Sequence, residues 1–226
     1  MRSLVRLRVE LDDRPGSLAR VAAAIAARDG NITAIDVLES EAGRVVDEIT
    51  VDAPSDLDMA LLRAEIGGMR DARVLSHQRA EVVDPIVRVV RRLARAIDRL
   101  PAGASEELCQ GIADLCATPA VIALDDAAAG DHAIGRRALA EPGRAVVART
   151  VSDVPPFGEA ITGEVSVVAV ATSVAGATRV VMVGRPVAQA FTPTECDRVE
   201  SLVALYARLT AVVDCGDEKA GRPGVR

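Results

Sequence analysis

Aromatic side chains are scarce in this chain. Its 226 residues include two phenylalanines, one tyrosine and no tryptophan. Surfaces that stack nucleic-acid bases are built largely from aromatic rings, so the scarcity argues against such a surface. The charge balance agrees, because 33 acidic and 27 basic side chains give a net charge of −6, whereas nucleic-acid-binding domains usually carry a basic excess. We expect no nucleic-acid partner.

Side chains suited to catalysis are also few. Lys219 is the only lysine, which excludes mechanisms that need a buried lysine to form a Schiff base. The two histidines, His77 and His132, lie in no metal-binding or nucleophile motif, and no phosphate-binding or dinucleotide-binding glycine motif is present. The sequence therefore predicts a protein that is not an enzyme and has no metal and no cofactor. The cysteines form no CxxC pair and are expected to be apolar fillers or free thiols: Cys109, Cys116, Cys196 and Cys215.

Long hydrophobic runs are missing too. The longest uncharged stretch, residues 165–178, has 14 residues, whereas a membrane-spanning helix needs about 18 or more. The first residues have charges spaced through them and no apolar signal-peptide core. These features predict a cytoplasmic protein with no membrane segment.

The hydrophobic pattern of residues 1–80 predicts six elements in the order βαββαβ. Residues 4–11 alternate as in a half-buried strand, and a helix follows from residue 18 to Asp29, closed by Gly30 and Asn31 as a left-handed cap. A second helix is expected to open with a capping box formed by Ser55 and Asp58. This order is typical of a ferredoxin-like domain, in which two helices cover one face of an antiparallel sheet. The remaining predicted strands are 32–38, 45–51 and 72–76.

Residues 81–100 are expected to form a linker helix, capped by Asp84 and started by Pro85. Its apolar stripe could pair two copies of the chain or pack on the following domain: Ile86, Val89, Val90, Leu93, Ile97 and Leu100. The opposite side carries arginines, most simply explained as a solvated face: Arg88, Arg91, Arg92, Arg95 and Arg99.

Residues 101–213 are expected to form a second domain around a central antiparallel sheet. A helix at 105–116 and a strand at 120–124 precede a loop-rich region, 125–144. Three further strands are expected at 145–150, 165–173 and 178–184, and a last helix starts at a capping box formed by Thr192 and Glu195. The polar, glycine-containing residues 214–226 predict a flexible tail.

The segment from Asp13 to Leu18 after the first strand, together with Gly30, Asn31 and Ile32 after the first helix, resembles the ACT domain over residues 3–79. This resemblance implies a small-molecule sensor whose ligand, typically an amino acid, binds at a subunit interface. Serine-binding members have histidine and asparagine where this chain has Leu11 and Asp13, so the ligand's identity stays open. Carried over by position, the ligand-binding residues are Asp12, Asp13, Arg14, Pro15, Gly16 and Asn31.

The chemistry of these positions suits an amino acid. The amides at a helix start can bind a carboxylate, an asparagine offers a donor and an acceptor, and an aspartate can receive an ammonium group. Simpler explanations remain open. Asp13 could serve only as an N-cap, Gly16 only allow close packing, and Asn31 only cap the helix end.

Residues 101–213 resemble a small GAF domain. The resemblance rests on Gly184-Arg185-Pro186 and on the segment from Phe191 to Glu195. No chromophore-attachment or cyclic-nucleotide motif accompanies them, so the resemblance implies no particular ligand. The whole sequence predicts a non-enzymatic regulatory protein that senses a small molecule as a homodimer and acts through its dimer or an effector protein. The alternative is a dimeric protein-interaction module with no ligand.

Overall fold

The computed structural model describes residues 1–80, 85–99, 104–118, 120–151, 157, 161, 164–174 and 176–220. The chain divides into two compact units, one of residues 1–84 with 192–194 and the other of residues 85–191 with 195–226. Both units contain a four-stranded sheet in which every pair of neighbouring strands is antiparallel. The predicted mixed α/β architecture with antiparallel sheets is confirmed.

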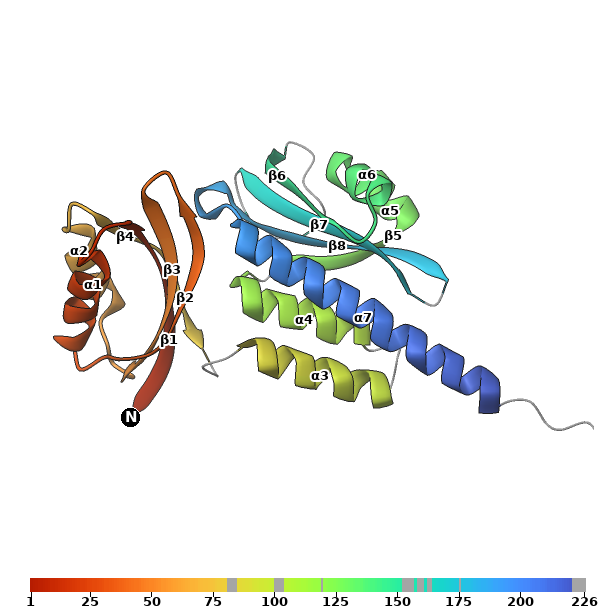
Figure 1. Ribbon diagram of the computed structural model, residues 1–226, viewed down its shortest axis with the longest axis horizontal. Coiled ribbons are helices and arrows are strands. Elements are labelled where there is room, and N and C mark those ends of the chain that lie inside the picture. The colour runs from red at the N-terminus through yellow and green to blue at the C-terminus, as the bar shows by residue number, and fades with distance from the viewer. Residues whose placement is uncertain are drawn as a thin grey trace, which may run out of the picture. The chain divides into compact units, whose positions relative to one another are not determined.

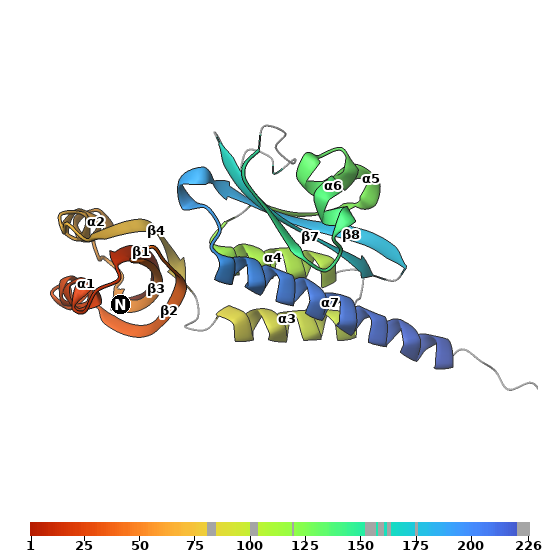
Figure 2. The ribbon, with the colours of Figure 1, turned by 45° about the horizontal axis from the view of Figure 1, so that its top comes forward.

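The N-terminal unit has the predicted order βαββαβ. Its sheet runs β2-β3-β1-β4, and both helices lie on the same face of it (Figures 1 and 2). The elements are β1 (Arg2–Asp12), α1 (Ser17–Ala26), β2 (Asn31–Glu41), β3 (Arg44–Pro54), α2 (Met59–Gly67) and β4 (Ala72–Ala80).

The core of this unit follows from the alternation along β1 and β3. Side chains at every second position point to the same face of a strand, so one face of β1 is apolar. Leu7 and Val9 are fully buried there and pack with Ile49 of β3 and with apolar residues of both helices. The helix residues in this core include Val21, Ile25, Leu62 and Ile66.

The first helix ends earlier than predicted. α1 stops at Ala26, the left-handed residue is Asp29 with φ 55°, and Asn31 already belongs to β2. Gly30 is needed for another reason. A Cβ atom there would lie 2.6 Å from Cγ2 and 2.9 Å from the carbonyl oxygen of Ile25, so the chain can turn closely past the helix end only at a glycine.

The predicted capping box at the second helix is wrong. Asp58 is the N-cap of α2, and its carboxylate accepts hydrogen bonds from the amides of Ala60 and Leu61 at 2.9 and 3.1 Å. Ser55 instead belongs to the turn after β3, where its amide donates to the carbonyl of Met1 at 3.0 Å.

The C-terminal unit is a sheet with helices on both faces. The strand order is β5-β8-β7-β6, with α4 and α7 on one face and α5 and α6 on the other (Figures 1 and 2). The elements are α3 (Pro85–Arg99), α4 (Ala104–Cys116), β5 (Val121–Asp125), α5 (Asp126–Gly130), α6 (Ala133–Ala140), β6 (Ala145–Val151), β7 (Val165–Val174), β8 (Ala177–Pro186), the short 3-10 helix η3 (Val187–Gln189) and α7 (Pro193–Ala220).

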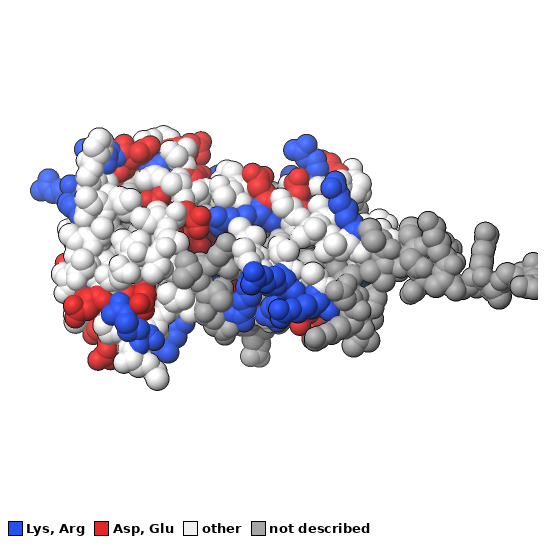
Figure 3. Space-filling model, turned by 60° about the horizontal axis from the view of Figure 1, so that its bottom comes forward, with Lys and Arg blue, Asp and Glu red and all other residues white. Residues whose placement is uncertain are grey.

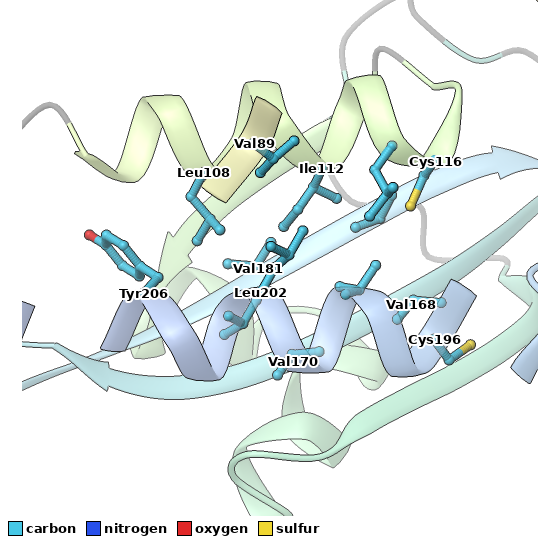
Figure 4. Close-up of a cluster of buried hydrophobic side chains, with 14 of the residues drawn as sticks. Val89, Leu108, Ile112, Cys116, Val168, Val170, Val181, Cys196, Leu202 and Tyr206 are labelled. Carbon is cyan, nitrogen blue, oxygen red and sulfur yellow. The ribbon is translucent and has the colours of Figure 1, made fainter. Parts of the chain in front are cut away.

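Neighbouring residues of β7 face two different cores. Val168 and Val170 pack with α4 and α7, as Figure 4 shows, whereas Val167 and Ala169 pack with Ile134 of α6. Burial on both faces favours apolar side chains at most positions, which explains the nearly continuous hydrophobic runs of the central strands.

Helix α3, expected as a connection between two domains, contributes to the core of the C-terminal unit. Val89 and Leu93 are almost completely buried there. The contact with α4 is close, because a Cβ atom on Gly111 would lie 2.5 Å from Cγ1 of Val89. Leu93 is therefore unavailable for pairing two copies of the chain. Asp84, Leu100 and the side chain of Ile97 lie outside the described residues.

The loop predicted at 125–144 is wrong, because it contains α5 and α6. Asp125 caps α5 by accepting a hydrogen bond from the amide of Ala128 at 2.8 Å. Gly135 lies inside α6, where a Cβ atom would be 2.0 Å from the carbonyl oxygen of Ala129. This glycine, which indicates a loop by sequence, allows two helices to touch.

The start of α7 is fixed by a buried ion pair that the sequence pattern does not indicate. Glu195, expected only in a capping box with Thr192, accepts hydrogen bonds from both terminal nitrogens of Arg185 at 2.8 and 2.6 Å. Arg185 also donates to the carbonyls of Cys116 and Ala190, and its guanidinium carbon lies 4.0 Å from the centre of the Phe191 ring. One side chain thus joins β8 to the ends of three other segments.

Helix α7 is longer than predicted. It continues past Val213 to Ala220, so most of the tail expected at 214–226 is helical. Residues 221–226 lie outside the described residues.

Candidate functional site

The loop between β1 and α1 holds most of the predicted ligand-binding residues. Gly16 is the N-cap residue of α1 with φ 90°, and no side chain caps the helix. No atom would crowd a Cβ at Gly16, so glycine is needed there for its backbone conformation and not for close packing. A helix without a side-chain cap has amide donors in its first turn for an anion, and its dipole favours negative charge there.

Asp13 is not an N-cap. Its carboxylate accepts a hydrogen bond from the hydroxyl of Ser40 at 3.2 Å, and its amide donates to the carbonyl of Gly43 at 2.9 Å. Asp13 thus lies beside the β2–β3 hairpin, where its carboxylate can receive a cationic group of a ligand.

Asp12 is already engaged by cations. Arg14 and Arg44 both bind its carboxylate, and Arg44 continues the network to Glu10 at 2.7 Å. The hydrogen bond from Arg14, followed by that from Arg44, holds the pKa of Asp12 below its usual value. Asp12 therefore orients Arg14 in the loop.

A cavity of about 400 Å³ opens beside this loop. Of the predicted residues, Arg14 and Pro15 line it. Ser17, Arg20, Arg70 and Asp71 complete the lining, and the sequence analysis missed all four. Asp71 accepts the Ser17 hydroxyl at 3.3 Å and pairs with Arg20. Three arginines around one cavity at the start of a helix form a site suited to a carboxylate.

Asp71 and Arg70 come next to this loop through the sheet. The amide of Asp12 donates to the carbonyl of Asp71 at 2.9 Å, because the end of β1 lies beside the start of β4. A ferredoxin-like strand order places the residues before β4 there, so the predicted topology contained a signal for them.

Asp47 is a further residue that the sequence pattern did not single out. It lies opposite Val9 in the β1–β3 ladder, so its side chain is on the same face as the core residues Val9 and Ile49. Its exposed fraction is 4%, and its Oδ1 atom has no hydrogen-bond partner among the described residues. Burial, and then the charge of Asp13, raises the pKa of Asp47. The signal is an acid at the second of five alternating β3 positions whose others are apolar: Val45, Ile49, Val51 and Ala53.

Asn31 lies far from the loop within one chain. It pairs with Asp52 of β3, which also pairs with Leu4, whereas the loop follows Asp12 at the other end of β1. Eight strand positions, from 4 to 12, span about 26 Å at about 3.3 Å per residue. One chain therefore does not bring Asn31 together with the other predicted residues.

The arginine face of α3 remains a charged surface. Arg91 and Arg95 are exposed, and Figure 3 shows basic side chains gathered over this helix. Arg92 pairs with Glu107 at 2.8 Å, which is an ion pair between neighbouring helices.

The thiols of Cys109 and Cys196 lack the surroundings of a nucleophile. Burial, and then the charge of Glu195, raises the pKa of Cys196 to about 11, and burial also raises the pKa of Cys109. A thiol with a raised pKa stays protonated and unreactive near neutral pH. Within the described part of the chain, no cluster of histidine, cysteine, aspartate and glutamate could hold a metal ion.

Comparison with known families agrees with the architecture of the N-terminal unit. Residues 5–67 match the model of the ACT domain, so the chain carries an ACT domain at its N-terminus. ACT domains commonly bind small ligands such as amino acids in a regulatory role, and they often dimerise. The match does not extend to the C-terminal unit.

Solved structures give weaker similarities. The ACT domain of a GTP pyrophosphokinase from Chlorobium tepidum is 15% identical over 35% of this chain and 100% of its own, with a TM-score of 0.29. A formyltetrahydrofolate deformylase from Pseudomonas putida KT2440 is 13% identical over 42% of this chain and 38% of its own, with a TM-score of 0.28. An unknown protein from Galdieria sulphuraria is 10% identical over 95% of both chains, with a TM-score of 0.32.

No curated protein matches the chain. Among the helices of the described residues, none is long and apolar enough to cross a membrane.

Proposed function

We propose that this protein is a non-enzymatic regulator that senses an amino acid at an ACT-type dimer interface. The observation that carries the proposal is the β1–α1 loop of the ACT domain. Its helix has no side-chain cap, and the cavity beside it is lined by Arg14, Arg20 and Arg70. The ligand's carboxylate binds the arginines and the first amides of α1. Its ammonium group binds Asp13, beside Ser40.

The separation of Asn31 from the loop supports a dimeric site. β2 is an edge strand, and an unpaired edge can pair with a second chain. Antiparallel pairing of two β2 strands around a twofold axis places the start of one beside the end of the other. Asn31 of a second copy then lies near Ser40 and Asp13 of the first.

The exposed side chains of β2 agree with such pairing. Ile35 is 42% exposed and Val37 is 58% exposed, although both belong to a strand of the sheet. Apolar residues on an edge strand favour association over solvation. The same surface supports the alternative function, a dimeric interaction module with no ligand.

The C-terminal unit is proposed to transmit the signal to an effector protein. Its expected similarity to a GAF domain is part of this proposal and is supported by an antiparallel sheet with helices on both faces. We assign it no ligand.

Thermal unfolding of the full chain with each common amino acid tests the sensor function. A ligand at one hundred times its Kd stabilises the folded state by about 2.7 kcal/mol. At roughly 2–4 °C per kcal/mol for a chain of this size, the right amino acid raises Tm by about 5–10 °C. Asn31→Ala and Arg70→Gln should each reduce this shift.

Arg79→Gln is the matched control for Arg70→Gln, because both arginines are exposed and Arg79 lies outside this cavity. The control should keep the full shift. If no amino acid moves Tm, or if Arg70→Gln and Arg79→Gln behave alike, the sensor function is wrong and the interaction module is favoured.

A further inference from the structure

A second cavity lies in the N-terminal unit, at the end of the sheet where β1 begins. Its volume is about 210 Å³. It is bounded by the first residues of β1, the last residues of β4 and the segment from the end of β3 into α2. It shares no lining residue with the cavity beside the β1–α1 loop. The lining residues are Ser3, Val5, Pro54, Ser55, Leu57, Met59, His77, Gln78 and Arg79.

The cavity has an apolar wall and a polar rim. Val5 is 7% exposed and belongs to the core of the unit, and Leu57 and Met59 pack against the same core. Arg79 lies opposite Val5 in the β1–β4 ladder, and His77 lies opposite Leu7, so both point to this face of the sheet. A short apolar group can therefore lie on Val5, Leu57 and Met59 while a polar group reaches the rim.

Arg79 gives the rim a positive charge. Arg79 and His77 are exposed, and no hydrogen bond or ion pair engages either side chain within the described residues. Burial, and then the charge of Arg63 on α2, lowers the pKa of His77. The positive charges of Arg63 and Arg79 beside His77 therefore favour an anion at this rim.

The size limits the ligand. The cavity volume of about 210 Å³ lies below the roughly 300–1,000 Å³ of pockets that hold drug-sized ligands, so it suits a small organic acid.

We propose that this cavity is a second ligand site, which binds a small monocarboxylate with a short apolar body. The carboxylate binds Arg79 and His77, and the apolar body packs on Val5, Leu57 and Met59. This site is independent of the amino-acid site proposed above, because the two cavities lie at opposite ends of β1.

The two histidines of the chain make a direct test possible. The ring Cε1–H signals of His77 and His132 are followed by NMR in the full chain while 3-methylbutanoate is added at constant ionic strength. Binding places a negative charge beside His77, so its signal should shift and its pKa should rise. His132, which belongs to the C-terminal unit, is the internal control and should not respond.

Two comparisons separate the charge from the apolar body. The uncharged 3-methylbutan-1-ol should leave the pKa of His77 unchanged, and acetate should bind more weakly than 3-methylbutanoate because it has a smaller apolar body. Arg79→Gln should weaken binding about tenfold through the loss of a charge-assisted hydrogen bond. Arg70→Gln, at the other cavity, should not change it.

Four results would overturn the proposal. The first two concern the NMR signals: His77 does not respond up to about 1 mM 3-methylbutanoate, or both histidines respond equally. The third is that the alcohol raises the pKa of His77 as much as the acid does. The fourth is that the Arg79→Gln variant binds 3-methylbutanoate as tightly as the unchanged protein. Because Arg79 is exposed, an unchanged Tm shows that this variant is folded. The two proposals can therefore be tested separately. Arg70→Gln should reduce the thermal shift caused by the amino acid, and Arg79→Gln should reduce the binding of 3-methylbutanoate.

Discussion

Two groups of ion pairs show how the same chemistry serves different purposes in the two units. At the end of β1, Asp12 pairs with Arg14 and Arg44 on the surface of the ACT domain. In the C-terminal unit, Arg185 and Glu195 pair at 2.6 Å with side-chain exposures of 3% and 5%. Exposed pairs contribute little to stability and can exchange partners with a ligand, whereas a buried pair cannot lose one partner without leaving the other uncompensated.

The largest expected effect comes from breaking the buried pair. Glu195→Gln leaves the Arg185 charge buried without its counter-ion, which should lower the free energy of unfolding by about 3–5 kcal/mol. Denaturant unfolding of the full chain measures this loss.

A double variant sharpens this prediction. Replacing the pair with Arg185→Met and Glu195→Leu removes both charges, so it should recover most of the lost stability. A double variant as unstable as Glu195→Gln would show that the contacts of Arg185 with the carbonyls of Cys116 and Ala190 matter more than the charge pair.

Replacing Asp47 should have an effect of intermediate size and opposite sign, because it should raise the free energy of unfolding. Because its pKa is raised in the folded protein, its contribution to stability is complete below its unfolded pKa and is lost as pH rises through its folded pKa. Asp47→Asn removes the ionised form, so no charge has to be buried on folding. A gain of about 1 kcal/mol in the free energy of unfolding at pH 7 corresponds to a rise in Tm of roughly 2–4 °C.

This gain should vanish in acid. Below the ordinary aspartate pKa of 3.8, the carboxyl is protonated in both the folded and the unfolded state, so the two proteins should have the same pH dependence. Melting curves from pH 3 to pH 8 measure the difference. A gain that is constant across this range would mean that the charge of Asp47 is not the cause.

The exposed pair at the β1–α1 loop should have only a small effect on the stability of the fold. Arg14→Ala removes one of the two cations on Asp12 and should change Tm by less than about 2 °C. The same variant should reduce the amino-acid shift, because Arg14 lines the cavity. A large fall in Tm with an unchanged ligand-induced shift would show that this ion pair stabilises the fold and does not contribute to ligand binding.

The edge strand provides a change with almost no effect on the fold. Val37→Lys places a charge at a residue that is already 58% exposed, so the free energy of unfolding of one chain should change by less than about 0.5 kcal/mol. Association should nevertheless be lost, because a lysine on an edge strand opposes pairing. Analytical ultracentrifugation at several protein concentrations measures the oligomeric state, and a stable dimer of this variant would contradict pairing through β2.

Sequence alone was enough for features that depend on neighbouring residues. Alternation predicted β1, because every second side chain faces the same core, and the order of elements predicted the sheet of the ACT domain. The segment from Asp13 to Leu18 predicted the loop at the start of α1 for the same reason. A turn and a helix start depend on a few consecutive residues.

Features that depend on distant residues were decided only by the tertiary structure. Gly135 indicates a loop until α5 is placed against α6, and Glu195 indicates a capping box until Arg185 is placed beside it. The strand register carries Asn31 about 26 Å from the loop that it was expected to join. Local sequence preferences determine each helix and strand. The surroundings of these charges and glycines depend on which helices and strands are in contact, and those contacts form only when the cores pack.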